Sequence, residues 1–160
     1  MQKALIAALL LVGALSSTLL VSSDPLTTTI TNPCGKQVGL SEYHEKHHPH
    51  LLKDGKWIWL KPEKYYWPVG CSAVFETLFY SDCPHIAAKL AIVADDHYSV
   101  YINGHKIKEG SWCQSVQTLE LKLKCGLNNL TISASNLDKK TPGGVAFAVY
   151  QDQSKCYGCR

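Results

Sequence analysis

The second half of the chain alternates hydrophobic and polar residues with a period of two. This period places successive side chains on opposite faces of an extended backbone, whereas a helix would repeat every 3.6 residues. Two aromatic-rich runs before residue 90 also have strand character, and a threonine-rich run near residue 30 is a weaker candidate. The sequence therefore predicts strands at residues 27–32, 56–60, 73–80, 90–96, 98–104, 119–126, 130–136 and 145–150.

Turn-forming residues separate the later runs. Aspartate closes turns through side-chain-to-backbone hydrogen bonds, and Asn-Gly tolerates the positive φ of a tight hairpin, so we interpret these residues as scaffold rather than ligand contacts. Short strands with regular turns predict an all-β protein, an antiparallel β-sandwich. The expected turns are at Asp95-Asp96, at Asn103-Gly104, at Gly126 with Asn128, and at Pro142-Gly143-Gly144.

Residues 32–56 do not follow this alternation. They are rich in glycine, proline and histidine, and these residue types favour a loop. We expect a loop here, with one helical turn beginning at Ser41. No internal repeat and no convincing domain boundary is visible.

The N-terminal residues have the order of a secretory leader. Lys3 precedes an apolar run over residues 4–15, and Val21 and Ser23 are small enough for the −3 and −1 positions of a cleavage site. An uncleaved membrane anchor is the alternative, but polar residues at 16–18 interrupt the run. We expect a signal peptide at 1–23, secretion, and no membrane association after cleavage. A histidine-rich extension at 24–55 and a β-sandwich domain with a cysteine-containing tail at 56–160 would follow.

Charge and cysteine content restrict the partners. The formal net charge is +3 with lysines and acids interspersed, so no basic run tracks a phosphate backbone and a nucleic-acid partner is excluded. In an exported chain, cysteines are normally disulfide-bonded. Their number is odd, so one is left free, buried or intermolecular, and an intermolecular bridge would give a disulfide-linked homodimer. The candidates are Cys34, Cys71, Cys83, Cys113, Cys125, Cys156 and Cys159, and Asn129-Leu130-Thr131 is a sequon for N-glycosylation.

One set of residues over about positions 56–150 resembles a known family. It comprises Trp57, Ile58, Trp59, Phe75, Phe79, Ala94, Asp95, Asp96, Tyr98, Tyr101, Asn103, Gly104, Trp112, Gly126, Asn128, Leu130, Ile132, Ala134 and Asn136. This pattern resembles the galactose-binding-like jelly-roll module, above all the accessory lectin-like domains of α-L-rhamnosidases and related secreted sugar-active proteins. The resemblance implies a jelly roll with neighbouring termini, and hence a Cys34 bridge to Cys156 or Cys159. The expected export adds disulfides that stabilise this jelly roll. The cysteines and the histidine-rich segment depart from the family.

Residues 44–48, HEKHH, match the H-E-x-x-H signature of zinc proteases, in which two histidines one helical turn apart bind the metal. Pro49 prevents a regular helix from continuing past His48. The β pattern elsewhere also offers no helices to frame such a site, so a zinc-dependent hydrolase is a minor alternative. We favour a solvated loop over metal binding, for which the candidate ligands are His44, His47, His48 and His50.

Aromatic residues between two predicted strands form a second candidate site. Exposed rings are platforms for the C–H faces of sugars, and their polar edges remain available for hydroxyl groups. Burial of these rings as one end of the core is an equally weighted alternative. The candidate ligand-binding residues are Tyr65, Tyr66 and Trp67, with Asp96, His97 and Trp112 as neighbours.

The pattern does not favour catalysis. Cys156 and Cys159 form C-x-x-C, but they follow a strand at the C-terminus and lack the βαβ context of a redox site. No nucleophile comes with a triad signature, and no cofactor is expected. We therefore expect a secreted, non-catalytic module that binds carbohydrate or a cell-surface partner. An extracellular assembly protein or secreted effector is the alternative.

Overall fold

The computed structural model describes residues 17–24, 29–31, 37–49, 51–61, 71–82, 87–111, 115–137 and 141–152. Within these residues the chain forms eleven strands and one short helix, and no helix there is long and apolar enough to span a membrane. The elements are β1 (Ser17–Ser22), β2 (Thr29–Thr31), β3 (Val38–Leu40), α1 (Glu42–His47), β4 (Ile58–Leu60), β5 (Ser72–Ser81), β6 (Ala87–Asp95), β7 (His97–Ile102), β8 (His105–Ser111), β9 (Gln117–Lys122), β10 (Gly126–Ser135) and β11 (Gly144–Asp152).

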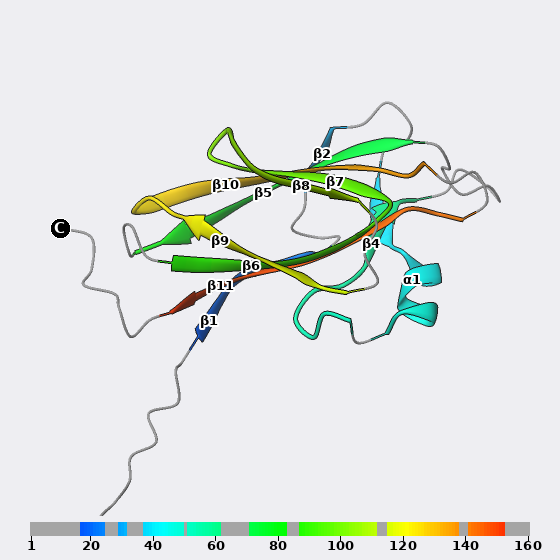
Figure 1. Ribbon diagram of the computed structural model, residues 1–160, viewed down its shortest axis with the longest axis horizontal. Coiled ribbons are helices and arrows are strands. Elements are labelled where there is room, and N and C mark those ends of the chain that lie inside the picture. The colour runs from blue at the N-terminus through cyan, green and yellow to red at the C-terminus, as the bar shows by residue number, and fades with distance from the viewer. Residues whose placement is uncertain are drawn as a thin grey trace, which may run out of the picture.

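The strands form two antiparallel sheets that pack face to face (Figure 1). The six-stranded sheet has the order β3-β4-β11-β6-β9, with β1 also paired to β11, and the five-stranded sheet has the order β2-β5-β10-β7-β8. From β4 to β7 and again from β8 to β11, the chain passes from one sheet to the other, as in jelly rolls. The predicted antiparallel β-sandwich is confirmed.

The core fills the space between the two sheets. Large side chains from both sheets are fully buried there, among them Trp59, Phe75, Tyr98 and Phe147. Burial alternates residue by residue along β5 and β7, as the period of two predicts. Burial of each such side chain stabilises the fold by about 1.5–3 kcal/mol, so this core holds the sheets together.

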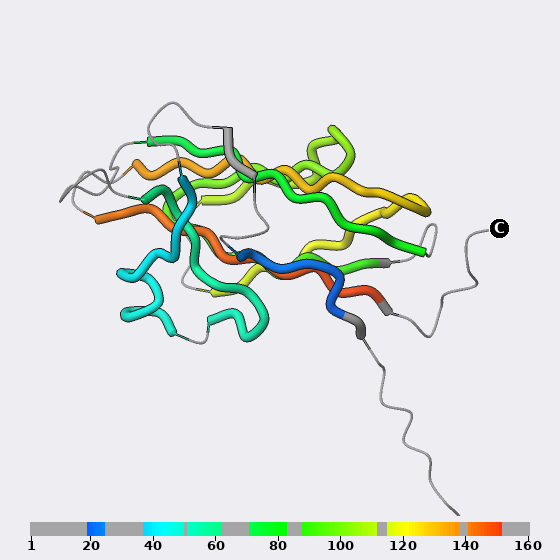
Figure 2. Tube along the Cα trace, turned by 180° about the vertical axis from the view of Figure 1, so that it is seen from behind, coloured from blue at the N-terminus to red at the C-terminus, as the bar shows by residue number. Residues whose placement is uncertain are grey.

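The outer face of the six-stranded sheet is covered by a segment of residues 41–49 and 51–57 (Figure 2). Val93 of β6 and Ala146 of β11 point to this face, and they pack with Trp57 and two leucines of the covering segment. Both faces of β6 and β11 are therefore buried, which explains why these strands are apolar at nearly every position.

A tyrosine near the C-terminal end of β11 binds the covering segment. The Tyr150 hydroxyl donates a hydrogen bond to Asp54 Oδ2 over 2.7 Å. Partial burial, together with this bond, raises the pKa of Tyr150 to about 12. Both effects favour the neutral hydroxyl, so the link persists well into the alkaline range.

All eight predicted strands are present, and three more were missed. β8 is exposed along nearly its whole length, so it carries no alternation, and β3 has only three residues. β1 lies within residues 1–23, which we assigned to the leader. β2 is an edge strand of the five-stranded sheet, and β3 is an edge strand of the six-stranded sheet.

Two of the four predicted turns, at Asn103-Gly104 and at Gly126 with Asn128, have the expected conformations. Asn103 has φ of 50° and Gly104 has φ of 81°, and these two residues connect β7 to β8. Gly126 has φ of 93°, and the Asn128 side chain bonds both backbone groups of Lys124. The conformations at these two turns were therefore predictable from the sequence.

We predict that Gly104→Ala destabilises the fold by about 1 kcal/mol, because an alanine is strained at positive φ. Nothing lies within 4 Å of an added Cβ at this position, so the loss of stability would come from backbone strain and not from a steric clash. Urea unfolding measures it. His105→Ala, at an exposed neighbouring position, is the control and should stay within about 0.5 kcal/mol of the unchanged protein. Equal stability of both variants would contradict the turn assignment.

Candidate functional site

Several connections between strands meet at one end of the sandwich, on the right in Figure 1. The β6–β11 register pairs Asp95 with Gly144, and the β10–β7 register pairs Ser135 with His97. By the other registers β5 and β9 begin at this end, and β4 and β8 finish there. We call it the Asp96 end. The connections that leave and return here are residues 61–71, 96, 112–116 and 136–143.

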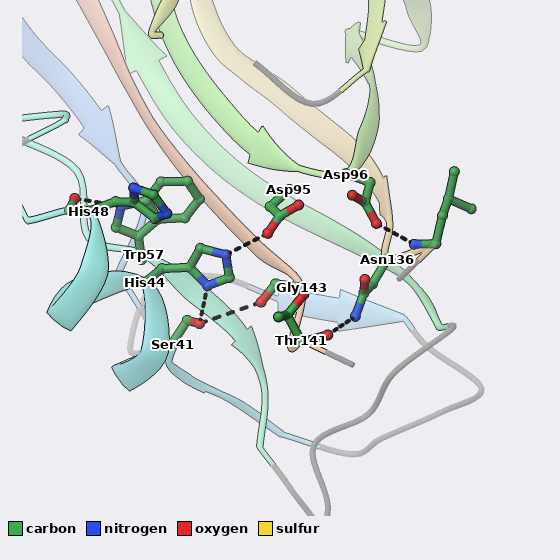
Figure 3. A network of polar contacts seen from close by, with 10 residues as sticks. Ser41, His44, His48, Trp57, Asp95, Asp96, Asn136, Thr141 and Gly143 are labelled. Atoms are coloured by element: carbon green, nitrogen blue, oxygen red, sulfur yellow. Dashed lines mark hydrogen bonds and ion pairs between the residues drawn. The ribbon is translucent and has the colours of Figure 1, made fainter. Parts of the chain in front are cut away.

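A buried histidine joins the helix to this end. Ser41 is the N-cap of α1, and His44 is the helix residue that is fully buried. The His44 Nε2–H group donates a hydrogen bond to Asp95 Oδ2 over 3.0 Å, because a carboxylate can only accept. Ser41 Oγ lies 2.7 Å from His44 Nδ1 (Figure 3). The first histidine of HEKHH thus links α1 to the last residue of β6.

The histidine ring is also packed on both sides. The Trp57 ring stacks on it with centroids 4.6 Å apart and an interplanar angle of 24°. On β11, a Cβ added to Gly144 would lie 2.7 Å from His44 Nδ1, so the ring needs a glycine there. Glu45 Oε1 accepts the Trp57 backbone N–H over 2.7 Å and completes the attachment of the helix.

These contacts correct the prediction of a solvated loop. His44 is buried, His48 is half-buried and only His47 of the three is exposed. The expected helical turn at Ser41 is present as α1. The loop interpretation failed because it treated all the histidines as solvated, whereas one has two polar partners in the interior.

The described part of the chain holds no cluster of three or more potential metal ligands. Both ring nitrogens of His44 already have partners, so a metal at HEKHH would have to break a buried hydrogen bond. His50 lies outside the described residues, and the four-histidine metal site stays a prediction.

Ser41, His44 and Asp95 are the three residue types of a hydrolase triad, yet their geometry does not suit catalysis. Ser41 and His44 have no exposed surface, and the Ser41 hydroxyl also lies 3.4 Å from the Gly143 carbonyl oxygen. A nucleophile must reach a substrate carbonyl with its base alongside. The cluster therefore has a structural role: it holds α1 against the end of β6 and the residues just before β11.

Asp96 organises the connection between β10 and β11. Its Oδ2 accepts the Leu137 backbone N–H over 2.6 Å, and its own N–H donates to the Ser135 carbonyl. Asn136 Nδ2 donates to the Thr141 carbonyl over 2.8 Å (Figure 3). We expected Asp96 to close a local turn, but the bond it makes fixes a connection about 40 residues further along the chain.

His97 lies where the Asp96 end meets the outer face of the five-stranded sheet. It is half-buried, and its strand neighbours are Ser111 on β8 and Ser135 on β10. Ser135 Oγ lies 2.8 Å from Ser72 Oγ on β5. Imidazole and hydroxyl groups are donors and acceptors of the kind that sugar hydroxyls require.

The other candidate residues are only partly placed. Tyr65, Tyr66, Trp67 and Trp112 lie outside the described residues, but the strands that flank both segments start or finish at the Asp96 end. Asn129 lies on β10, half-buried, and its Oδ1 is the buried side-chain polar atom without a partner among the described residues. Glycosylation at Asn129 stays a prediction.

Sequence reasoning missed the residues that build this end. Asp95, Ser41 and Asn136 were assigned turn or loop roles or none, although each is buried or partly buried and hydrogen-bonded. The available signals were the Ser-x-x-His spacing at a helix start and the paired glycines at 143–144. Neither identifies a partner in a distant strand.

We predict that His44→Ala lowers the free energy of unfolding by about 2–4 kcal/mol, because it leaves a cavity and removes a partner from Asp95 and Ser41. Urea unfolding measures the loss. The exposed His47→Ala change on the same helix is the matched control and should cost less than about 0.5 kcal/mol. Equal effects at the two positions would refute this structural role.

No protein-family profile and no curated protein sequence matches this chain. The fold is similar to parts of several solved structures. A lectin from Pleurotus ostreatus, in complex with GalNAc, has a TM-score of 0.50 and 18% identity, and the match covers 79% of this chain and 35% of the lectin chain. An α-L-rhamnosidase from Streptomyces avermitilis, complexed with L-rhamnose, has a TM-score of 0.51 and 17% identity, with coverage of 87% and 12%.

A family 35 carbohydrate binding module from Clostridium thermocellum has a TM-score of 0.47 and 11% identity, and the match covers 84% of this chain and 97% of that one. The lectin and rhamnosidase matches are consistent with a galactose-binding-like jelly roll, as the sequence resemblance implied. At these identities the likeness concerns the fold. This chain spans about a third of the lectin and a smaller part of the rhamnosidase.

Proposed function

We propose that this chain is a secreted, non-catalytic module that binds carbohydrate at the Asp96 end. One observation carries the proposal: the sandwich brings the flanks of both aromatic segments, 62–70 and 112–114, to the end that also holds Asp96 and His97. These segments are far apart in the sequence. Rings for stacking and polar groups for hydroxyls would thus share one surface.

The hydrogen bonds of this end support a preformed site. The Asp96 carboxylate fixes the start of the β10–β11 connection, and His44 fixes α1 beside it. A rigid site loses less conformational freedom when a ligand binds, and it therefore binds more tightly for the same contacts. Asp96 acts here as a scaffold for the loop, and His97 with the aromatic residues would contact the sugar.

We predict that the purified protein binds glycans on an array, and that His97→Ala and Trp112→Ala weaken the binding at least tenfold, which is about 1.4 kcal/mol. GalNAc and L-rhamnose, the sugars of the two structural neighbours, are the first ligands for calorimetry. His105→Ala is the matched control, because His105 is exposed beside the Asn103-Gly104 turn at the opposite end of β7.

A blank array together with blank calorimetry would overturn the carbohydrate proposal. If binding occurs but His105→Ala weakens it as much as His97→Ala does, the binding surface is elsewhere. Both results are independent of whether the chain is exported.

Disulfides are part of the proposal. We infer that Cys71 and Cys125 each form a disulfide. They precede antiparallel neighbours, β5 and β10, and so lie at opposite ends of that strand pair. Cys71 and Cys125 are therefore not expected to pair with each other, and the other five cysteines lie outside the described residues. The Cys34 bridge to Cys156 or Cys159 stays a prediction.

We predict that reduction with dithiothreitol lowers the free energy of unfolding by about 2–5 kcal/mol for each bridge lost. Urea unfolding with and without the reductant measures this. Superimposable curves would contradict a stabilising role for the disulfides.

An extracellular assembly protein is the second candidate. Its support is an exposed apolar corner on the five-stranded sheet, where Tyr80 lies opposite Leu127 and Leu78 is close by on β5. Their side chains are 65%, 54% and 60% exposed. Non-reducing electrophoresis separates the candidates, since a covalent dimer through the odd cysteine favours assembly and a monomer favours the binding module.

A further inference from the structure

The strand β1 occupies an edge of the sandwich that nothing else in the described chain covers. β6 pairs with one edge of β11 over its length, and β4 pairs with the other edge at Val145. β1 continues along that second edge in five antiparallel pairs, from Ser22 opposite Ala148 to Ser17 opposite Asp152. Figure 2 shows β1 in blue alongside the red end of β11.

The side chains of β1 contribute to the core. Leu20 and Val21 are partly buried and pack against the main core cluster, whereas Leu19 is 42% exposed. The strand is therefore amphipathic at its place in the sheet. Without it, the backbone N–H and C=O groups of residues 148–152 on this edge would lose their partners.

Ser23, the residue after β1, connects β1 to β11 and to the covering segment through buried hydrogen bonds. It is buried, its N–H donates to the Phe147 carbonyl over 2.8 Å, and its Oγ accepts the Phe147 N–H over 3.0 Å. The same hydroxyl donates to the Lys56 carbonyl over 2.7 Å, and the Ser23 carbonyl accepts the Lys56 N–H. A Cβ on Gly55 would lie 3.0 Å from Ser23 Oγ, so Ser23 is tightly packed.

A cut between Ser23 and Asp24 conflicts with this structure. It would remove the whole of β1 and expose the edge of β11. It would also remove Ser23, whose side chain and backbone are the hydrogen-bond partners of the Phe147 N–H and C=O groups. Buried backbone groups are almost always paired, and an exposed, unpaired edge invites association with other chains. The small residues at 21 and 23 fit a cleavage site by composition, but they have structural roles in the folded protein.

We propose that the leader is removed N-terminal to β1, by hydrolysis of the peptide bond after Ala14, so that the mature chain begins at Leu15. Val12 and Ala14 supply small residues at the −3 and −1 positions, and residues 4–12 remain as an apolar run of adequate length. Water adds to the Ala14 carbonyl carbon, the C–N bond to Leu15 breaks, and the products are a carboxyl group on the leader and an amine on Leu15. This inference rests on the proposed export of the chain.

Secretion of the full chain with its own N-terminus from yeast, followed by intact mass and N-terminal sequencing, tests the proposal. The expected N-terminus is Leu15. A mature chain that begins at Asp24 overturns the proposal. A chain that stays inside the cells with Met1 in place overturns it together with export, whereas carbohydrate binding of the purified chain is judged separately.

Two shortened chains behind one heterologous leader test the structural reason. The chain that begins at Leu15 should unfold cooperatively, whereas the chain that begins at Asp24 should melt at least 10 °C lower or show no transition. Equal melting temperatures would overturn the proposal.

A pair of single substitutions in the Leu15 chain tests the role of Ser23. Ser23→Ala should lower the melting temperature by about 4 °C or more, since it removes the hydroxyl shared by Phe147 and Lys56. Ser22→Ala changes the neighbouring, half-buried serine and should have a much smaller effect. If Ser23→Ala and the unchanged chain have the same melting temperature, Ser23 does not hold β1 to the interior, and this result would overturn the proposal.

Discussion

The hydrogen bond between His44 and Asp95 is the interaction on which the Asp96 end depends. It joins the covering segment to the six-stranded sheet at the residue where the chain leaves for the five-stranded sheet. Burial of two polar side chains has a desolvation cost, and paired partners with good geometry offset it without a large surplus. The pair therefore contributes less to stability than to the placement of α1. Both ring nitrogens of His44 have hydrogen-bond partners only when the helix lies in this position.

The same constraint explains several residues nearby. Gly144 leaves room for the His44 ring, and Trp57 stacks on that ring. The Ser41 hydroxyl contacts His44 Nδ1 and makes no capping hydrogen bond to the helix. Asp96 then fixes the start of the β10–β11 connection. The Asp96 end, made of connections from both sheets, gains rigidity from these few buried bonds, and rigidity is what the proposed ligand site would require.

Most of the fold could be predicted from the sequence because hydrophobic and polar residues alternate along the strands that form the core. β5, β7 and β10 each have one buried face, so their period of two is visible. β8 could not be found because it is an edge strand with no buried face. β1 was hidden because an apolar edge strand and the end of a leader have similar composition, and pairing with β11 is a tertiary property.

The candidate site was less predictable. The sequence identified residue types suited to sugars, but the meeting of distant connections at one end follows from strand register, which local patterns do not contain. HEKHH shows the same limit. Its histidines resemble a metal motif, yet the position of Asp95 decides the role of His44, and that contact spans 51 residues.

The most direct test of this account is the long-range ¹⁵N–¹H NMR spectrum of the His44 imidazole. The account predicts a ring with its hydrogen on Nε2, in slow exchange with water, whose signals change in Asp95→Asn and stay unchanged when zinc is added. Rapidly exchanging His44 signals like those of the exposed His47, or signals that respond to zinc but not to Asp95→Asn, would contradict it.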